Sequence, residues 1–137
     1  MIFVDTNVVS ETLRIRPAEQ ALAWLRRHDA QLALSSVVIA ELAFGISKIH
    51  PDQRAFRLAT GLDEWRRRFA GRIFAFTEES AMIYGQIMGS ATRSGRAMSA
   101  QDGMIAAIAR GHDSPLATRN GSDFDTAEIA IINPWGD

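Results

Sequence analysis

The amino-acid sequence predicts an α/β domain of three layers, α/β/α, in which helices cover both faces of a central, mostly parallel sheet. Short apolar segments alternate along the chain with longer segments of helical periodicity, an order typical of parallel strands joined by crossover helices. The first short segment, 2–4, is continuously apolar, as expected for a strand buried on both faces. The 137 residues contain no repeat, low-complexity tract or linker, so we expect residues 1–137 to form a single domain.

In the first half of the chain, the strand over 2–4 is followed by a predicted helix over 17–28, which begins at a proline. Proline is favoured in the first turn of a helix. The apolar stripe of this helix consists of Ala21, Leu22, Trp24 and Leu25. A second strand over 32–34 then leads through two serines into a helix over 36–49.

In the second half, a helix over 51–69 precedes a strand over 73–76. Thr77 is a predicted N-cap, because it is followed by two acidic residues that suit the first turn of a helix. The remaining predicted elements are the helix that Thr77 starts, which extends to about Thr92, a turn over 93–98, a helix that begins at Ser99 and carries the apolar segment 100–109, and strands over 116–118 and 129–132.

Composition narrows the classes of site that the chain can hold. It has no cysteine, which excludes disulfides, thiolate nucleophiles and cysteine-containing zinc or iron–sulfur sites. The first residues lack a basic start followed by a long apolar stretch, and no apolar run approaches the roughly 20 residues that a membrane helix needs. We therefore expect a cytoplasmic protein with no membrane partner.

The basic residues are almost all arginine, although the net charge is −1, and Lys48 is the only lysine. Arginine forks fit phosphate oxygens and stack on bases, so some of these side chains could contact nucleic acid. The candidates are Arg66, Arg67, Arg68, Arg93, Arg96, Arg110 and Arg119. A solvated helix face or an acidic partner explains the same residues equally well.

Three carboxylates occur in apolar surroundings, at Asp5, Glu41 and Asp102. The residues three and four positions either side of Glu41 are Val37, Val38, Phe44 and Gly45, so no basic residue neighbours it on its helix. A carboxylate placed there needs a cation from elsewhere in the fold, and a hard metal ion with oxygen ligands is one solution. Asp5 and Asn120 both follow a predicted strand, and open α/β sheets bind ligands at that edge.

Local roles could account for each of these residues separately. Ser99 and Asp102 fit a helix capping box, and the segment Asp5-Thr6-Asn7 could be a helix N-cap. Glu41 could face solvent, and the residues around Asp123 resemble a turn. Together, these explanations require several coincidences, which favours a shared site.

Several motifs resemble those of the PIN-domain toxins of VapBC type, the VapC family. They are residues 1–11, 35–45, 99–109 and 117–124, in this order, and the ending 132–135 is most similar to the FitB branch. The resemblance covers essentially the whole chain. It implies a single PIN-like nuclease domain.

The resemblance also implies a function and a set of partners. The expected activity is that of a Mg²⁺- or Mn²⁺-dependent endoribonuclease, with tRNA or another structured RNA as substrate. The protein would be the toxin of a type II toxin–antitoxin system, neutralised by a cognate antitoxin encoded beside it. We expect a homodimer, a heterotetramer or larger complex with the antitoxin, and operator DNA bound through the antitoxin. The helices over 17–28 and 51–69 would form part of the antitoxin groove, and an antitoxin arginine could reach the acids.

By the same resemblance, Asp5, Glu41 and Asp102 are the metal-binding and catalytic acids. The family's fourth acid falls at Asn120, where an amide keeps the carbonyl oxygen but lacks the charge. Asn120 would orient water or phosphate as a fourth catalytic residue, and Asp123 is the candidate for the missing carboxylate. This departure favours one firmly bound ion, with any second ion arriving with the substrate.

Residues next to these acids have supporting roles in this interpretation. Thr6, Asn7 and Ser99 would fix carboxylate rotamers, whereas Arg119 either reaches a substrate phosphate or is a surface residue. Because the fourth acid is replaced, the alternative function is a module that binds nucleic acid or a partner without cutting. Metal-dependent cleavage separates the two functions. The three histidines are too scattered in sequence to form a ligand set.

Overall fold

Five strands form one sheet in the order β3-β2-β1-β4-β5, and all four pairings are parallel. The computed structural model describes residues 1–136 of the chain. The strands are β1 (Ile2–Val4), β2 (Leu32–Ser35), β3 (Ile73–Phe74), β4 (Leu116–Ala117) and β5 (Ile131–Ile132). The predicted α/β class with a parallel sheet is confirmed.

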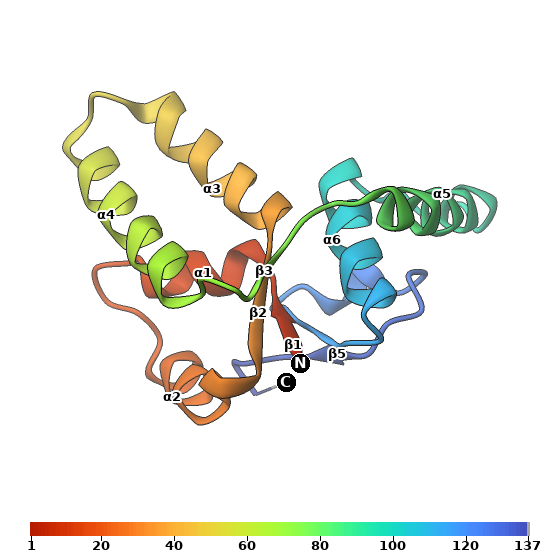
Figure 1. Cartoon of the computed structure of the whole chain (residues 1–137), viewed down its shortest axis with the longest axis horizontal. Helices are drawn as coiled ribbons and strands as arrows, with labels where there is room; N and C mark the ends of the chain where they lie inside the picture. The colour runs from red at the N-terminus through yellow and green to blue at the C-terminus, as the bar shows by residue number, and fades with distance from the viewer. Residues whose placement is uncertain (137) are drawn as a thin grey trace.

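Helices flank this sheet on both sides (Figure 1). They are α1 (Thr6–Thr12), α2 (Glu19–His28), α3 (Ser36–Ile49), α4 (Gln53–Arg68), α5 (Glu78–Arg93) and α6 (Ala100–Gly111), with short 3₁₀ turns η1 (Asp29–Gln31) and η2 (Gly121–Phe124). In Figure 1, α1 to α4 lie to one side of β1 and β2, and α5 packs with α6 on the other side. Within the described residues 1–136, no helix is long and apolar enough to cross a membrane.

The core surrounds the central strand, β1, and all three residues of this strand are buried. Phe3 and Val4 are each 1% exposed, and β2 beside them is buried along its whole length. α6 contributes a continuous buried segment from Ile105 to Ala109. An apolar strand without alternation therefore lies between two layers of helices, as its sequence predicts.

The chain turns directly from strand into helix at the carboxyl ends of β1 and β2, and side-chain caps make these turns possible. The Asp5 carboxylate accepts a hydrogen bond from the Thr6 amide at 2.8 Å, and α1 starts there. Likewise, the buried Ser35 hydroxyl accepts from the Val38 amide at 3.2 Å, at the start of α3. Each cap satisfies an amide that the first turn of a helix leaves free, and α1 and α3 both begin at the same edge of the sheet.

Several predicted boundaries were wrong by a few residues. The helix predicted over 17–28 begins at Glu19, because Ala18 has extended backbone angles and donates its N–H to the Glu11 carboxylate at 2.7 Å. α4 starts at Gln53 after the Asp52 cap, not at the proline before it. The strands predicted over 73–76, 116–118 and 129–132 are each only two residues long. α1 was not predicted as an element, although Asp5 was identified as a possible cap.

Candidate functional site

An open cleft of about 500 Å³ lies at the carboxyl edge of the sheet. Its lining residues come from the ends of β1 and β4, from α1, α3 and α6, and from the chain after β4. They are Asp5, Thr6, Asn7, Ser10, Glu11, Arg14, Glu41, Asp102, Arg119, Asn120, Asp123 and Trp135. The cleft thus brings together all the predicted catalytic, metal-binding and supporting residues except Ser99, whose hydroxyl accepts a hydrogen bond from the Asp102 amide at 3.1 Å.

Asp5 is a buried acid of the cleft, with 5% of its surface exposed. One carboxylate oxygen, Oδ1, caps α1, and the other, Oδ2, accepts hydrogen bonds from Thr118 Oγ1 at 2.7 Å and Asn7 Nδ2 at 3.4 Å. Burial raises the pKa of Asp5 above its usual value, although the bonds from Thr118 and Thr6 act in the opposite direction. The capping role and a place in the cleft coexist in one side chain.

Thr118 is a buried residue of the site that the sequence analysis missed. Its hydroxyl donates to Asp5 and accepts from Asn7 Nδ2 at 3.2 Å and from the Asn120 amide at 3.1 Å. The side chain is fully buried, so these bonds replace all of its contacts with water. The only available signal was a polar residue that ends a buried strand two positions before Asn120.

Glu41 reaches the cleft from α3, beyond the first turn of that helix. Its Oε1 atom accepts a hydrogen bond from Thr6 Oγ1 at 2.6 Å. The Oδ1 atom of Asn7, the residue after Thr6, accepts a hydrogen bond from the Arg119 amide at 3.2 Å, and its Nδ2 atom donates one to Asp5. Thr6 and Asn7 therefore donate hydrogen bonds to two neighbouring acids of the cleft, Glu41 and Asp5.

Asp102 lies in the first turn of α6 and is half-buried. Its pKa is raised to about 6, chiefly by burial and then by the negative charges of Asp5, Asp123 and Glu41. These acids repel one another because they carry the same charge, and none of them has a basic partner. Among residues 1–136, the ion pairs within 4.0 Å all involve other carboxylates.

The cleft has the donor chemistry of a site for a hard divalent ion. Its candidate ligands are carboxylate, amide and hydroxyl oxygens, which suit Mg²⁺ and Mn²⁺ rather than metals that prefer sulfur or imidazole. In the part of the chain that the structure describes, however, no three carboxylates or histidines are grouped closely enough to hold an ion. Carboxylates repel one another, and a bound cation would relieve that repulsion. The residues therefore fit a metal by chemistry and charge.

Asn120 and Asp123 both line the cleft, at the start and within the 3₁₀ turn η2. The turn is closed by a hydrogen bond from the Asp123 amide to the Asn120 carbonyl at 3.1 Å. The charge of Asp123 raises the pKa values of Asp5 and Asp102, which places its carboxylate within electrostatic reach of both. Asp123 is thus an acid of the cleft, three residues after Asn120.

Most of the candidate nucleic-acid arginines are engaged elsewhere. Arg66, Arg68, Arg96 and Arg110 form ion pairs with carboxylates outside the cleft. Arg119 differs because its guanidinium lies over the indole of Trp135, 4.9 Å from the ring centre. The sequence analysis includes Trp135 only within the chain ending 132–135 and does not predict its place in the cleft.

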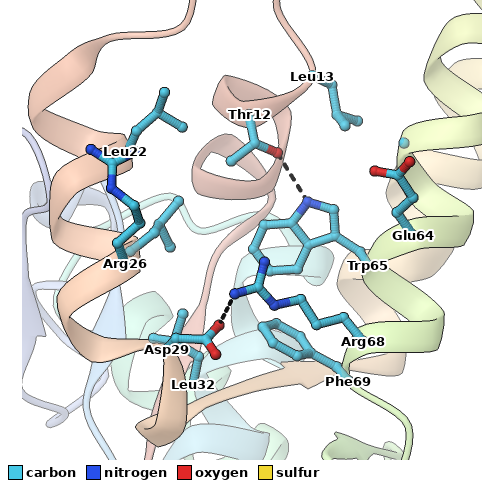
Figure 2. A pocket seen from close by; sticks show the side chains of 12 residues that line it. Thr12, Leu13, Leu22, Arg26, Asp29, Leu32, Glu64, Trp65, Arg68 and Phe69 are labelled. Carbon is cyan, nitrogen blue, oxygen red and sulfur yellow. Dashed lines mark hydrogen bonds and ion pairs between the residues drawn. The ribbon is translucent and has the colours of Figure 1, made fainter.

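A separate hollow of about 320 Å³ lies between α1, α2 and α4 (Figure 2). In Figure 2 the indole of Trp65 points into it and donates to Thr12 Oγ1 at 2.9 Å, and Arg68 pairs with Asp29 at 2.7 Å. The lining residues are Thr12, Leu13, Leu22, Leu25, Arg26, Asp29, Leu32, Gly61, Glu64, Trp65, Arg68 and Phe69. The walls of this hollow are apolar with charged residues among them, and we call it the groove below.

Two of the most similar curated proteins match over their full length. A family model described as PIN domain covers residues 2–129 of the chain. The chain is 40% identical over 139 residues to Toxin FitB of Neisseria gonorrhoeae, and the match covers 100% of both sequences. It is 38% identical over 140 residues to VapC ribonuclease Y4jK of Sinorhizobium fredii, with 98% of each sequence covered.

Solved structures show the same arrangement of elements. The structure of FitAB bound to an IR36 DNA fragment has a TM-score of 0.91 with this chain at 37% identity, covering 100% of this chain and 97% of that one. The family model, the two sequence relatives and the fold all agree. The chain therefore belongs to the PIN-domain family, in the VapC group of toxins that includes FitB.

Proposed function

We propose that the protein is a metal-dependent endoribonuclease that hydrolyses phosphodiester bonds of RNA in the cytoplasm, as the toxin of a toxin–antitoxin pair. The observation that carries the proposal is the cleft that Asp5, Glu41, Asp102 and Asp123 all line, without a basic partner for any of the four. The Sinorhizobium relative is named a ribonuclease. A structured RNA such as tRNA is the proposed substrate.

Asp5 and Asp102 would hold a Mg²⁺ or Mn²⁺ ion, which when bound lowers the pKa of water and offsets charge on the phosphate. Thr118, Asn7 and the Thr6 amide fix both oxygens of Asp5, so its orientation is set before any ligand arrives. Thr6 engages only one oxygen of Glu41. The other oxygen can accept the proton of the attacking water.

We assign the fourth carboxylate of the site to Asp123, and to Asn120 the orientation of water or phosphate. The support is the shared cleft and the repulsion that Asp123 exerts on Asp5 and Asp102. The alternative function, a module that binds without cutting, was based on the loss of the fourth acid at Asn120. An acid three residues later in the same cleft weakens that basis.

We propose that the groove between α2 and α4 receives a segment of the cognate antitoxin. The groove has apolar walls, charged residues and a volume that suits a few side chains. The FitAB structure similar to this chain contains DNA, which is consistent with an operator complex formed through the antitoxin. A homodimer, and a heterotetramer or larger complex with the antitoxin, complete the proposed assembly.

Asp5→Asn and Asp102→Asn each remove one negative charge while they keep the size of the side chain. We expect metal-dependent cleavage to fall by more than the roughly 10- to 100-fold loss typical of residues that only support a metal ligand. The measurement is cleavage of total tRNA and of a structured RNA with Mg²⁺, Mn²⁺ or EDTA. Asp63→Asn, on the exposed face of α4, is the control. Metal-dependent activity retained by Asp5→Asn would remove Asp5 from the mechanism.

Asp123→Asn and Asp125→Asn form a matched pair, because the two acids lie two residues apart. Asp125 is exposed and pairs with Arg96 at 3.2 Å, away from the cleft. We expect Asp123→Asn to lower the cleavage rate by roughly 10- to 100-fold and Asp125→Asn to leave it near the wild-type value. Unchanged cleavage by Asp123→Asn would refute the assignment of the fourth carboxylate, and an equal loss in both variants would indicate a disturbed turn.

The pKa of Asp102 predicts a stability that depends on pH. Because its pKa in the folded chain is about 6 and its usual value is 3.8, its carboxylate destabilises the metal-free fold above pH 6. The effect disappears as the pH falls to about 4. At pH 7 in EDTA, Asp102→Asn should raise the free energy of unfolding by about 1–2 kcal/mol, after allowance for solvent screening. Urea denaturation at pH 7 and 4.5 measures the difference, and a variant less stable than wild type at pH 7 would contradict it.

Leu22→Glu places a charge on the wall of the proposed antitoxin groove. We expect the affinity for the antitoxin encoded beside this protein to fall at least about 10-fold, since a buried unpaired charge is costly. Met82→Glu, at an exposed position of α5, is the control. Calorimetric titration measures the affinity, and RNA cleavage by both variants checks that they fold. Equal affinity of Leu22→Glu and wild type would exclude this groove.

A further inference from the structure

A polar recess of about 580 Å³ adjoins the carboxylate cleft where the chain leaves β4. It is lined by Thr118, Arg119, Asn120, Gly121, Ser122, Ile131, Asn133 and Gly136. Arg119 and Asn120 line both hollows. A flexible chain molecule bound at the carboxylates can therefore continue into the recess past these two residues.

The cleft and the recess differ in charge. The cleft is lined by five carboxylates, those of Asp5, Glu11, Glu41, Asp102 and Asp123. Among residues 1–136, no carboxylate lines the recess, and Arg119 is the charged side chain there. If one phosphodiester lies at the metal, the acidic walls of the cleft would repel the phosphodiester next to it. The recess, which contains Arg119, would accommodate that neighbour.

Arg119 is held in position, and its charge reaches Glu11, whose pKa is lowered chiefly by the hydrogen bond from the Ala18 amide and also by Arg14 and Arg119. The Arg119 amide donates to Asn7 Oδ1 at 3.2 Å, and its guanidinium lies 4.9 Å from the centre of the Trp135 ring. Among residues 1–136, no carboxylate lies within 4.0 Å of this guanidinium, whereas the other arginine of the cleft, Arg14, is paired with Glu11 at 3.3 Å. The hydrogen-bonding fork of Arg119 is therefore available to an incoming anion.

Trp135 has its own support from the end of β5. Its amide donates to Asn133 Oδ1 at 2.8 Å, and Pro134 between them is buried. β4 and β5 are paired in parallel, so the chain segments that follow them carry Arg119 and Trp135 to the same edge of the sheet. The indole face thus provides a fixed platform for the guanidinium.

We propose that the recess binds the RNA nucleotide adjacent to the scissile bond, with Arg119 on its phosphate and Trp135 as the residue that positions Arg119. This inference rests on the proposed function and adds a second binding element to the same site. Asn120, at the border, would lie between the scissile phosphate and its neighbour. Arginine pairs with phosphate through two parallel hydrogen bonds when its plane is fixed, which is what the indole achieves.

Binding of RNA by the Asp5→Asn protein tests the inference without cleavage. A fluorescein-labelled single-stranded RNA is titrated in Mg²⁺ at several salt concentrations and followed by fluorescence anisotropy. Adding Arg119→Gln should weaken binding roughly 10-fold and reduce the slope of log K against log salt by about 0.7, the value for one phosphate contact on a single strand. Arg54→Gln, in the first turn of α4 outside both hollows, should change neither quantity.

A double-mutant cycle tests the role of Trp135. Trp135→Leu should weaken binding when Arg119 is present and have no further effect in the Arg119→Gln protein, whereas Trp135→Phe, which keeps an aromatic face, should bind like the parent. Thermal denaturation checks that each variant folds. If Trp135→Leu weakens binding equally in both backgrounds, the indole contacts RNA itself and its positioning role is refuted.

The outcomes separate this inference from the proposed function. Cleavage that needs Asp5, together with binding that Arg119→Gln leaves unchanged, would overturn the recess and keep the nuclease. Binding that depends on Arg119 in a protein that never cleaves RNA would support the recess and overturn the nuclease. No binding of RNA by the folded parent would overturn both.

Discussion

The hydrogen bond from Thr118 to Asp5 is the contact on which the candidate site depends. It joins the ends of β1 and β4, which are neighbours in the sheet, and both side chains are almost completely buried. A buried carboxylate is costly unless hydrogen bonds compensate it, and the amide of Thr6 and the side chain of Asn7 complete this compensation. Because Asn7 and Thr118 in turn hold the backbone of Arg119 and Asn120, this one network places the far wall of the cleft as well.

Helix starts and cleft acids coincide at this edge of the sheet: the Asp5 carboxylate caps α1 and lines the cleft, and Asp102 lies in the first turn of α6, which Ser99 caps. Parallel strands that end at one edge deliver several helix starts to that edge, and Asp5 and Asp102 each lie at one of them. The N-terminus of a helix favours negative charge, which offsets part of the repulsion between the acids. The local and shared explanations of these residues, which compete when the sequence alone is considered, describe one structure.

The sequence predicts the parts of the fold that follow from periodicity and burial, and it predicts the site where acids interrupt apolar segments. Asp5, Glu41 and Asp102 were found because their charge contradicts their surroundings. Thr118 was missed because a threonine that ends an apolar strand is ordinary, and its importance comes from Asp5, 113 residues away. α1 is only seven residues long, too short for a clear period. The predicted start of α2 was wrong because proline is favoured in the first turn of a helix, whereas the Ala18 amide donates a hydrogen bond to the distant Glu11 carboxylate and keeps Ala18 out of the helix.

α1 connects the two hollows that the proposed function uses. Its last residue, Thr12, and the following Leu13 line the groove, whereas Ser10, Glu11 and Arg14 line the carboxylate cleft. A segment bound in the groove therefore needs to pass only one turn of helix to reach the acids. Any cation that enters the cleft relieves the same repulsion that raises the pKa of Asp102, whether it is a metal ion or a basic side chain of the segment. On this proposal an inhibitor need not block the substrate, because it can compete with the metal for the carboxylates themselves.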